Sequence, residues 1–322
     1  MFRKIPIILT ADQLLDLSIR RTKKIKIEDR DVRYKTKKTI IARTDSFVDT
    51  IVSKLESYVK KFPSIEQLPK FYQEIIDIKI NTDKLKKSLG AVDWARKTCI
   101  MIYSKQIRSL KKTGNIDFLK QKQKEIYGRI SSVLHQIDEN LIFLADAQNI
   151  MKKFPTILDV PTIVIAGYPN VGKSSLLKHL SSAKPEIATY PFTTKQVIVG
   201  HAKIEEKFTT KTYQIIDTPG LLDRPLAKRN DIEKQAIAAL AHLADIIVFM
   251  IDPSETCGYS LKNQYNMLGQ IKKLFEDVPI VVVENKADLK KTDSSEFKIS
   301  CENKEGIDQL ATEILRMIKT ES

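Results

Sequence analysis

The chain has 322 residues, of which 54 are lysine or arginine and 40 are aspartate or glutamate, so its formal net charge is +14. Hydrophobic residues make up 42% of it and charged residues 29%, which excludes a wholly disordered protein and suits about two globular domains. No apolar stretch reaches the ~20 residues of a membrane-spanning helix, and the first apolar run is too short for a secretory signal, so a cytoplasmic protein is expected. Cys99, Cys257 and Cys301 are far apart in sequence, which predicts three small buried side chains and no disulfide framework.

The net charge lies entirely in the first half of the chain. Residues 1–160 contain 33 basic and 19 acidic residues, whereas residues 161–322 contain 21 of each. Such confinement favours a surface for an acidic partner, such as RNA or anionic lipid, over a general solubility device. The alternative for the densest run is a solvated helix face. Ten basic residues in nineteen positions make up this run and are the candidate RNA contacts: Arg20, Arg21, Lys23, Lys24, Lys26, Arg30, Arg33, Lys35, Lys37 and Lys38.

Long amphipathic helices are expected before residue 155. Residues 10–13, Thr-Ala-Asp-Gln, predict a capping box that opens a short first helix. Apolar residues recur every three to four positions over 40–62, 85–113 and 126–145, which predicts three further helices. Trp94 lies within the pattern over 85–113 and is expected in the core.

The period of the apolar residues changes near residue 155. Short β-branched runs that alternate with amphipathic segments predict an α/β domain with a mainly parallel sheet over 156–322. The expected organisation is therefore an all-α helical bundle, 1–155, followed by this α/β domain. The predicted strands are 162–166, 197–200, 213–217, 245–252 and 279–285, with a further one near 296–300.

A phosphate-binding loop (P-loop) is predicted directly after the first strand. Residues 167–175 match the pattern GxxxxGK[ST], in which the glycines let backbone N–H groups curl round a phosphate. Lys173 is expected to reach the β- and γ-phosphates, and Ser174 to place its hydroxyl on Mg²⁺. The predicted phosphate-binding residues are Gly167, Tyr168, Pro169, Asn170, Val171, Gly172, Lys173, Ser174 and Ser175.

A later motif selects the base. The Asp288 carboxylate in Asn-Lys-Ala-Asp (285–288) can accept hydrogen bonds from the ring N–H and the exocyclic amine of guanine, a donor pair that adenine lacks. Asn285 and Lys286 would brace the loop and cover the base. Ser300 and Cys301 follow a short strand, and the N–H of Cys301 is expected to donate to the guanine oxygen. The predicted nucleotide is therefore GTP or GDP.

Two switch segments are expected between these motifs. Asp217 ends a strand and is predicted to hold Mg²⁺ through water, while the N–H of Gly220 senses the γ-phosphate. In the first switch a threonine would close over Mg²⁺, and we favour Thr194 over Thr193. Loss of the γ-phosphate would release both segments. The expected switch residues are Thr193, Thr194, Asp217, Thr218, Pro219, Gly220 and Leu221.

Leu221 stands where Ras-type enzymes carry the glutamine that positions water, so slow intrinsic hydrolysis of GTP is expected. Asn170 is the fourth residue of the phosphate loop. An asparagine there resembles the loop of GTPases that use K⁺ as a positive charge in place of an arginine finger. Asn170 is therefore a candidate K⁺ ligand; the alternative is that it only caps the loop. Arg224, Lys228 and Arg229 are interpreted as partner contacts or as solvated charges.

The motifs GYPNVGKSSL, YPFTTK, DTPGLLDRP and NKAD, with KFPSIEQLPKFYQEIIDIKI before the long helices, resemble the NOG (nucleolar G protein) family of Obg-type, translation-factor-class P-loop GTPases. The resemblance covers nearly the whole chain. It implies a compact archaeal member that binds and hydrolyses GTP and joins the precursor of the large ribosomal subunit. No RNA-binding motif such as an aromatic-bearing sheet is visible, so ribosomal RNA would be recognised by shape and phosphate, without DNA specificity. A monomer is expected.

Two alternatives remain at this point. The basic bundle would bind a protein partner in one, and an anionic membrane surface in the other. The basic run has few bulky apolar residues to insert into lipid, and no lipidation signal is present, which disfavours the membrane.

Overall fold

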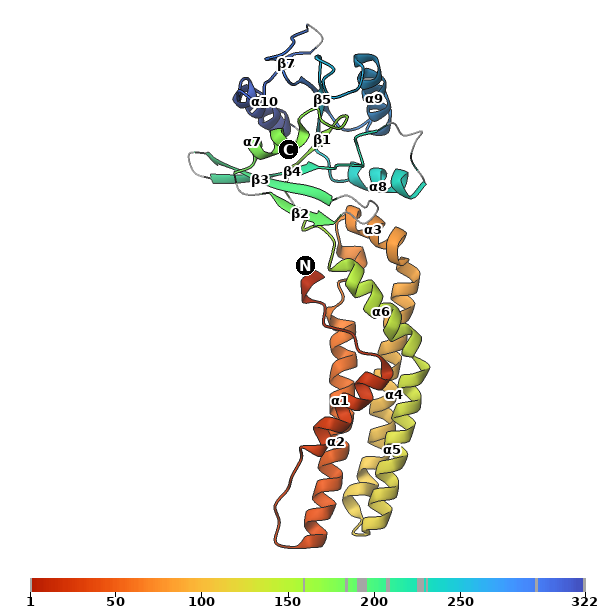
Figure 1. Ribbon diagram of the computed structural model, residues 1–322. Coiled ribbons are helices and arrows are strands. Elements are labelled where there is room, and N and C mark those ends of the chain that lie inside the picture. Colours follow the sequence, from red (N-terminus) through yellow and green to blue (C-terminus); the bar gives the residue numbers. More distant parts are fainter. Residues whose placement is uncertain are drawn as a thin grey trace. The chain divides into compact units, whose positions relative to one another are not determined.

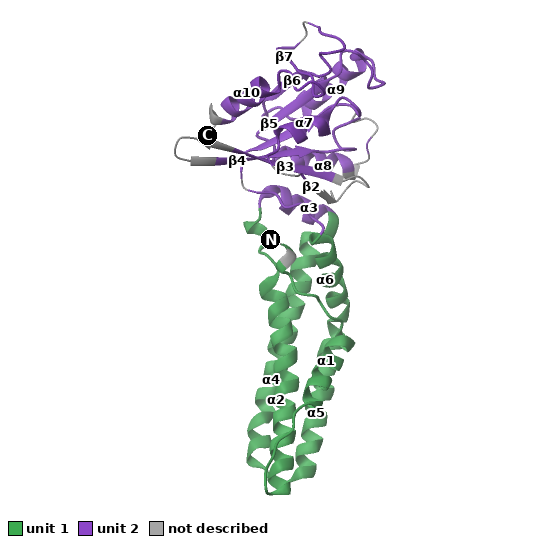
Figure 2. Ribbon diagram, turned by 60° about the vertical axis from the view of Figure 1, so that its left-hand side comes forward, with its two compact units in different colours: residues 1–68, 79–152 green, residues 69–78, 153–322 purple. Residues whose placement is uncertain are grey.

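The structure is a computed structural model that describes residues 2–158, 160–182, 185–189, 196–206, 209–224, 229, 231–292 and 295–320. The chain forms two compact units, which Figure 2 distinguishes by colour. The first unit comprises residues 1–68 and 79–152, and the second comprises residues 69–78 and 153–322. Relative to the predicted boundary after residue 155, residues 69–78 and 153–155 belong to the second unit.

The first unit is entirely helical, and α2, α4 and α5 run side by side while α1 lies against α2 (Figure 1). α2 contacts α4, and both helices also contact α5. This is the all-α bundle that the periodicity predicted. Its elements are η1 (Phe2–Lys4), α1 (Ala11–Lys23), α2 (Val32–Lys61), η2 (Ile65–Gln67), α4 (Thr82–Lys112), α5 (Ile116–Gln136) and α6 (Asp138–Met151).

Local signals set several helix ends. The predicted capping box is confirmed, because the Thr10 hydroxyl accepts from the Gln13 N–H at 3.4 Å and the Gln13 side chain accepts from the Thr10 N–H at 3.1 Å. The predicted single helix over 126–145 is wrong. At Ile137 the backbone leaves the helical region (φ −106°, ψ 8°), so α5 ends and α6 begins.

The buried side of α4 carries Leu85, Val92 and Cys99, as the apolar pattern predicted. The core position predicted for Trp94 is wrong, because 49% of this residue is exposed. Successive residues of a helix are rotated by 100°, so Trp94 lies about 160° from Val92 and points away from the buried side of α4. The same rotation leaves Met101 47% exposed.

The second unit contains a seven-stranded sheet in the order β2-β3-β4-β1-β5-β6-β7. β1 pairs in parallel with β4 and β5, and β6 pairs in parallel with β5 and β7, which confirms the mainly parallel sheet. β3 runs antiparallel to both β2 and β4. The strand β2 was not predicted. The strands are β1 (Thr162–Ala166), β2 (Glu186–Thr189), β3 (Gln196–Glu206), β4 (Thr209–Asp217), β5 (Ile246–Ile251), β6 (Ile280–Glu284) and β7 (Phe297–Lys298).

Helices cover both faces of this sheet (Figure 1). α7 (Lys173–Leu180) and α10 (Ile307–Thr320) contact each other on one face, and α8 (Asp231–Ala241) and α9 (Leu261–Leu274) lie on the other. β1 and β5 are buried at every position because they lie between these layers. The carboxyl ends of the parallel strands therefore meet at one edge, where the loops after them can form a site.

The helix α3 (Lys70–Ile80) interrupts the bundle in sequence but contributes to the second unit. The Tyr72 hydroxyl donates to the Pro155 carbonyl at 2.7 Å and accepts from the Ile157 N–H at 2.8 Å. Glu74 lies 2.8 Å from His242, at the end of α8. These contacts hold α3 beside the segment that leads into β1.

Candidate functional site

The loop between β1 and α7 has the backbone that a phosphate cradle requires. Gly167 and Gly172 have φ values of +138° and +104°, which L side chains rarely adopt. A Cβ on Gly167 would lie 2.6 Å from the Met250 carbonyl oxygen, and one on Gly172 would lie 2.1 Å from Asn285 Nδ2. Asn170 also has a positive φ, 63°, which asparagine tolerates. Both glycines are therefore required by local geometry.

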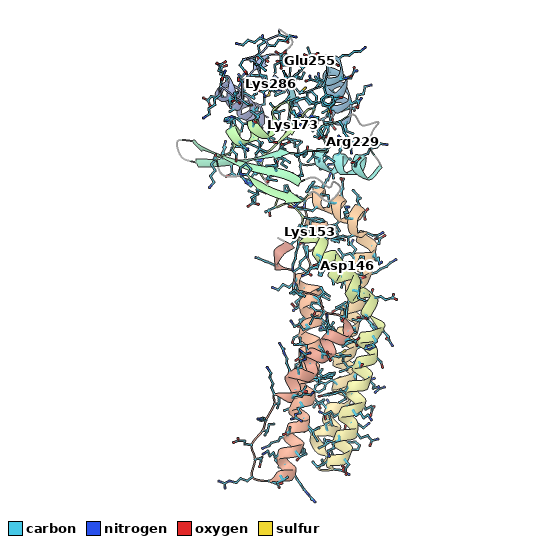
Figure 3. All side chains as sticks on the ribbon, in the orientation of Figure 1. Asp146, Lys153, Lys173, Arg229, Glu255 and Lys286 are labelled. Carbon is cyan, nitrogen blue, oxygen red and sulfur yellow. The ribbon has the colours of Figure 1, made fainter. Side chains whose placement is uncertain are left out.

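The side chain of Lys173 turns back into this loop (Figure 3). Its ammonium group donates to the carbonyl oxygens of Gly167 at 2.8 Å and Tyr168 at 2.7 Å, and the residue is buried. Because Gly172 caps the N-terminus of α7, the positive end of the helix dipole and this ammonium point at the same small volume. The arrangement is suited to an anion such as a polyphosphate.

Asp217 and Ser174 place a carboxylate and a hydroxyl together on one side of the site. Asp217 ends β4 and is paired in register with Ile165 of β1, and its Oδ2 accepts from the Ser174 hydroxyl at 2.6 Å. The other carboxylate oxygen of Asp217 is buried and has no hydrogen-bond partner, and burial raises the pKa of this carboxyl. Hydroxyl and carboxylate oxygens are the ligands that Mg²⁺ prefers, so the donor set fits this ion. Thr193 and Thr194 lie outside the described residues.

The segment after Asp217 folds on itself. The Gly220 N–H, the predicted γ-phosphate sensor, donates to Asp223 Oδ2 at 2.7 Å. The Arg229 guanidinium donates to the Gly220 carbonyl at 3.1 Å and to the Arg224 carbonyl at 2.9 Å. Leu221 is 1% exposed. In this arrangement the Asp223 carboxylate accepts the hydrogen bond that the Gly220 N–H is predicted to donate to a γ-phosphate.

The interpretation of Arg229 as a solvated charge or partner contact is wrong, because its side chain is buried and burial lowers the pKa of its guanidinium. Arg224 does lie at the surface, where it donates to Glu233 of α8 at 2.6 Å. Lys228 lies outside the described residues.

The predicted base-binding residues converge beside the P-loop. The Asn285 amide donates to the Val171 carbonyl at 2.8 Å and accepts from the Cys301 N–H at 3.0 Å. The Ser300 hydroxyl donates to Asp288 at 2.6 Å, which holds one oxygen of this carboxylate in a fixed position. The Cys301 N–H is thus engaged by Asn285 here, and its bond to a guanine oxygen stays a prediction.

Lys286 is anchored by a residue that the sequence analysis missed. Its ammonium lies 2.7 Å from Asp252 Oδ2 and 2.8 Å from the Thr256 hydroxyl. Burial acts to raise the pKa of Asp252, but hydrogen bonds from Lys286, Ser254 and the Cys257 N–H outweigh it and lower this pKa. An aspartate directly after the apolar run of β5 was the available signal.

An aromatic contact joins the P-loop to the segment after β5. The rings of Tyr168 and Tyr259 lie 4.2 Å apart between centroids, and Tyr168 is buried although it occupies a variable position of the motif. From the motif, Tyr168 was expected only to be part of the phosphate loop. Its ring also packs the P-loop against the segment after β5, which carries the Lys286 partner Asp252.

The three cysteines are free thiols, and that of Cys257 donates to the Tyr259 carbonyl at 3.7 Å and accepts from the Gln264 amide at 3.6 Å. Cys99 and Cys257 are buried as expected, and Cys301 is partly exposed. Burial raises the pKa of the Cys99 thiol to about 12 and that of Cys301 to about 11, so both remain protonated at neutral pH. Among the described residues, no group of three or more histidine, cysteine or acidic side chains could hold a metal ion.

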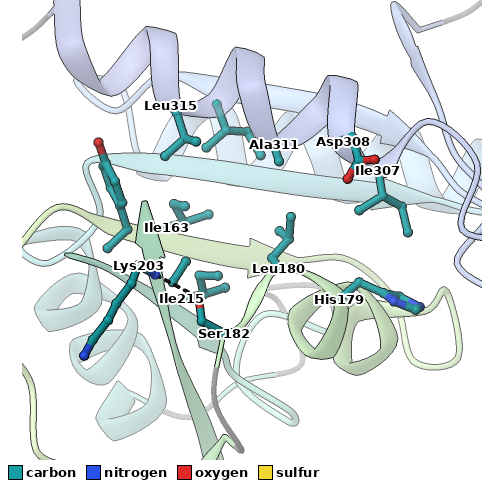
Figure 4. A pocket seen from close by; sticks show the side chains of 13 residues that line it. Ile163, His179, Leu180, Ser182, Lys203, Ile215, Ile307, Asp308, Ala311 and Leu315 are labelled. Carbon is teal, nitrogen blue, oxygen red and sulfur yellow. Dashed lines mark hydrogen bonds between the residues drawn. The ribbon is translucent and has the colours of Figure 1, made fainter. Parts of the chain in front are cut away.

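A second cavity, of about 170 Å³, lies between α7, α10 and the β3–β4 hairpin (Figure 4). Ile163, Ile215 and Ala311 are among its apolar lining residues, and the Lys203 N–H donates to the Ser182 hydroxyl at its rim. It shares no residue with the P-loop or the base-binding loop. Its mainly apolar lining is not suited to a polyphosphate.

Comparison with known proteins identifies the family. Residues 2–158 match the NOG1 N-terminal helical domain, and residues 231–288 match nucleolar GTP-binding protein 1 (NOG1). An uncharacterized protein of Methanocaldococcus jannaschii is 42% identical over 292 residues, which cover 89% of this chain and 81% of that protein. The chain belongs to the NOG1 family. It is accordingly a GTP-binding protein with a P-loop GTPase domain.

Eukaryotic NOG1 proteins are longer than this chain. Nucleolar GTP-binding protein 1 of Arabidopsis thaliana is 32% identical over 98% of the chain, and probable nucleolar GTP-binding protein 1 of Dictyostelium discoideum is 32% identical over 90%. The chain spans 46% and 43% of these two proteins. A solved structure assigned to nucleolar GTP-binding protein 1 of Plasmodium falciparum is 34% identical, covers 52% of this chain and 91% of that one, and has a TM-score of 0.45. Within the described residues, every helix is too short or too polar to cross a lipid bilayer.

Proposed function

We propose that this NOG1-family protein is a GTP-hydrolysing switch that acts in assembly of the large ribosomal subunit, through a basic bundle (1–155) that binds ribosomal RNA and a GTPase domain (156–322). The observation that carries the proposal is that the net positive charge and the nucleotide site lie in different halves of the chain. The nucleotide site lies in the half with no net charge, and the whole excess of +14 lies in residues 1–160. Phosphate contacts supply sequence-independent affinity for RNA, which a bundle of this charge can provide.

The basic segment is open to a polyanion. It runs through the end of α1, the connection 24–31 and the start of α2, so it is not one helix face. Nine of its ten basic residues are exposed, and Lys37 is half-buried. Within the described residues, the ion pairs of this segment are those of Arg20 with Asp16 at 4.0 Å and Lys38 with Asp29 at 2.8 Å. The Lys37 ammonium donates to the Lys111 carbonyl at 2.9 Å. The other seven cations form no ion pair within the described residues and can bind phosphate.

For catalysis, Lys173 would leave the carbonyls of its own loop for the β- and γ-phosphates, and Ser174 and Asp217 would hold Mg²⁺ together with Thr194. The ion would neutralise charge on the phosphates during transfer of the γ-phosphoryl group to water. The exposed Asp288, with one oxygen fixed by Ser300, would accept from guanine. Burial of Leu221 supports a slow intrinsic rate, since no polar side chain there can orient water.

The γ-phosphate would displace Asp223 from the Gly220 N–H. Two carboxylate or phosphate acceptors cannot share one donor without strong repulsion, so GTP and the arrangement seen here exclude each other. This exchange supports a switch in which GTP and GDP set different conformations of the segment after β4.

Sedimentation tests the proposal. The protein is centrifuged with ribosomal particles in a sucrose gradient with GTP, GDP or a non-hydrolysable GTP analogue. Nucleotide-dependent migration with large-subunit precursors is the expected result. A protein that stays at the top of the gradient in every nucleotide state would contradict a ribosomal role. A complex that persists in high salt would show that the bundle binds ribosomal protein rather than RNA phosphates, because salt weakens phosphate contacts.

A further inference from the structure

The helix α4 carries a row of exposed cations around the chain's single tryptophan. Of its 31 residues, nine are lysine or arginine and two are aspartate. We define the α4 face as Lys87, Trp94, Met101, Lys105, Arg108 and Lys112, all of which are exposed. At 100° and 1.5 Å per residue, these six side chains fall within about 60° of arc along ~37 Å of helix. They therefore form one continuous stripe on the bundle.

The cations of this stripe form no ion pair within the described residues, although Asp83 lies one turn before Lys87. Elsewhere on α4, Glu66 pairs with Lys86 at 2.7 Å, and Asp93 pairs with Arg96 and Lys97 at 2.8 and 2.7 Å. In the part of the chain that the structure describes, no ion pair includes any of the four cations of the α4 face, which are Lys87, Lys105, Arg108 and Lys112. Like charges at this spacing repel one another until an anion neutralises them.

The indole of Trp94 is accessible in the middle of these charges. The residue is 49% exposed, although a tryptophan would gain from burial against the core. Gly90 lies one turn before Trp94, and a Cβ added there would meet nothing within 4 Å. The helix surface beside Trp94 on that side is therefore open.

We propose that the α4 face binds a single-stranded segment of RNA, with an unpaired base stacked on Trp94 and phosphates held by the cations on either side. This inference rests on the proposed function and names the form of RNA and the surface that takes it. A positive groove or stripe with an exposed aromatic ring is suited to single strands, because every unpaired base offers a face for stacking. In a duplex these faces are hidden.

The position of the stripe also favours a polyanion over a protein or a membrane. The Lys37 ammonium donates to the Lys111 carbonyl at 2.9 Å, so the last turn of α4 meets the basic segment at the start of α2. A strand on the α4 face could thus continue onto further cations. Only Trp94 and Met101 are apolar on this face, too few to insert into lipid or to form a dehydrated protein interface.

The single tryptophan makes a direct test practicable. Emission of Trp94 in the intact chain is titrated with a single-stranded oligouridylate of about 12 nucleotides, with an RNA duplex, and with long-chain polyphosphate, which has charge but no bases. We expect the single strand to quench the emission, and polyphosphate to bind while leaving it unchanged. Binding is followed separately by fluorescence anisotropy of labelled RNA. Saturation with the single strand without a change in emission would overturn the inference.

Variants separate stacking from charge. Trp94→Ala should weaken binding of the oligouridylate about 5- to 100-fold, and Trp94→Phe should restore most of it. Ile142→Ala is the matched control, because Ile142 is 46% exposed on α6 and lies outside the α4 face. Equal affinities of Trp94→Ala and Ile142→Ala would overturn the stacking contact.

Lys105→Gln with Arg108→Gln should reduce the slope of log affinity against log salt by about 1.4, since each phosphate contact on a single strand contributes about 0.7. Lys272→Gln with Lys273→Gln, on exposed positions of α9, should leave the slope unchanged. Equal slopes for the two double variants would remove the α4 face from the RNA contact.

Failure of this inference differs from failure of the proposed function. If the protein migrates with ribosomal particles but the oligouridylate leaves Trp94 unaffected, the proposed function stands and the α4 face is not its RNA contact. If the particles change Trp94 emission while naked RNA of either form does not, the face binds a protein, which also overturns the inference. If the protein neither migrates with the particles nor binds RNA, both proposals fail.

Discussion

The Asn285 amide donates to the Val171 carbonyl at 2.8 Å, which joins the base-binding loop to the P-loop across 114 positions of sequence. The same amide accepts from the Cys301 N–H, so one buried side chain fixes three segments that each follow a different strand. The spacing between phosphate and base recognition is therefore set by a contact inside the protein before any nucleotide binds.

Gly172→Ala should abolish this arrangement. The new Cβ would lie 2.1 Å from Asn285 Nδ2 at a residue with φ of +104°, so either the amide or the loop must move. We expect affinity for GDP to fall more than about 10-fold, measured by titration with a fluorescent GDP analogue. Gly269→Ala on α9 is the matched control, because its Cβ would meet nothing within 4 Å, and it should leave affinity unchanged. Unchanged affinity in Gly172→Ala would show that the loop adapts.

Asp288→Asn should change which base is bound. The substituted amide offers one donor and one acceptor where guanine presents two donors, so GTP affinity should fall about 100-fold. Xanthine carries an oxygen in place of the guanine amine, and xanthosine triphosphate should therefore gain affinity. Competition binding with both nucleotides measures the exchange, and Asp308→Asn, at an exposed position of α10, serves as the control. A loss of GTP without any gain of the xanthine nucleotide would contradict direct base recognition by Asp288.

Asp217→Asn should stabilise the nucleotide-free protein. Burial raises the pKa of Asp217 in the folded state, so the ionised carboxylate destabilises the fold, and this cost grows as pH rises from about 3.9 through the raised folded pKa. The amide removes the charge and can still accept from Ser174. We expect the melting temperature at neutral pH to rise by about 2–4 °C for ~1 kcal/mol, with a smaller difference from the unsubstituted protein below pH 4.

Calorimetry with and without Mg²⁺ completes this measurement, because the variant should lose the stabilisation that Mg²⁺ gives with GDP. Asp277→Asn, on the exposed turn after α9, should change neither value. A variant that melts lower than the unsubstituted protein at neutral pH would mean that the carboxylate is compensated within the fold.

Leu221→Gln should not create a faster enzyme. The leucine is 1% exposed, so a glutamine there would bury an amide away from water, at a cost of about 1–3 kcal/mol. We expect a lower melting temperature and no gain in single-turnover hydrolysis of GTP. Leu158→Gln, at a residue that is 41% exposed, should leave the melting temperature within error. Faster hydrolysis in Leu221→Gln would require the side chain to turn outward when GTP binds.

Hydrolysis should be faster in K⁺ than in Na⁺ if Asn170 ligates the cation. Since Asn170 has φ of 63°, replacement by alanine would strain the loop, and glycine is the better probe. Asn170→Gly keeps the backbone and removes the ligand, so it should hydrolyse GTP equally slowly in both salts. Asn170→Asp keeps an oxygen and should retain part of the K⁺ effect. Equal rates of the unsubstituted protein in K⁺ and Na⁺ would contradict the role.

The sequence determined the features that depend on neighbouring residues. The Thr10 capping box, the buried stripe of α4 and the turn that Gly167 and Gly172 permit each follow from spacing of three or four residues or from a backbone that one residue type adopts. Motif order also placed Asp217 and Asn285 at strand ends. These signals sufficed for the fold class and for the family.

Which side chains meet depends on how distant elements of the fold pack together. Nothing near Lys286 in sequence marks Asp252 as its partner, and the asymmetry between buried Arg229 and exposed Arg224 depends on how their segment folds back over Gly220. The periodicity of α4 located the apolar stripe but not the side of Trp94, since an aromatic residue counts as apolar wherever it points. Long-range contacts and exposure result from packing of distant elements, whose geometry a local pattern does not contain.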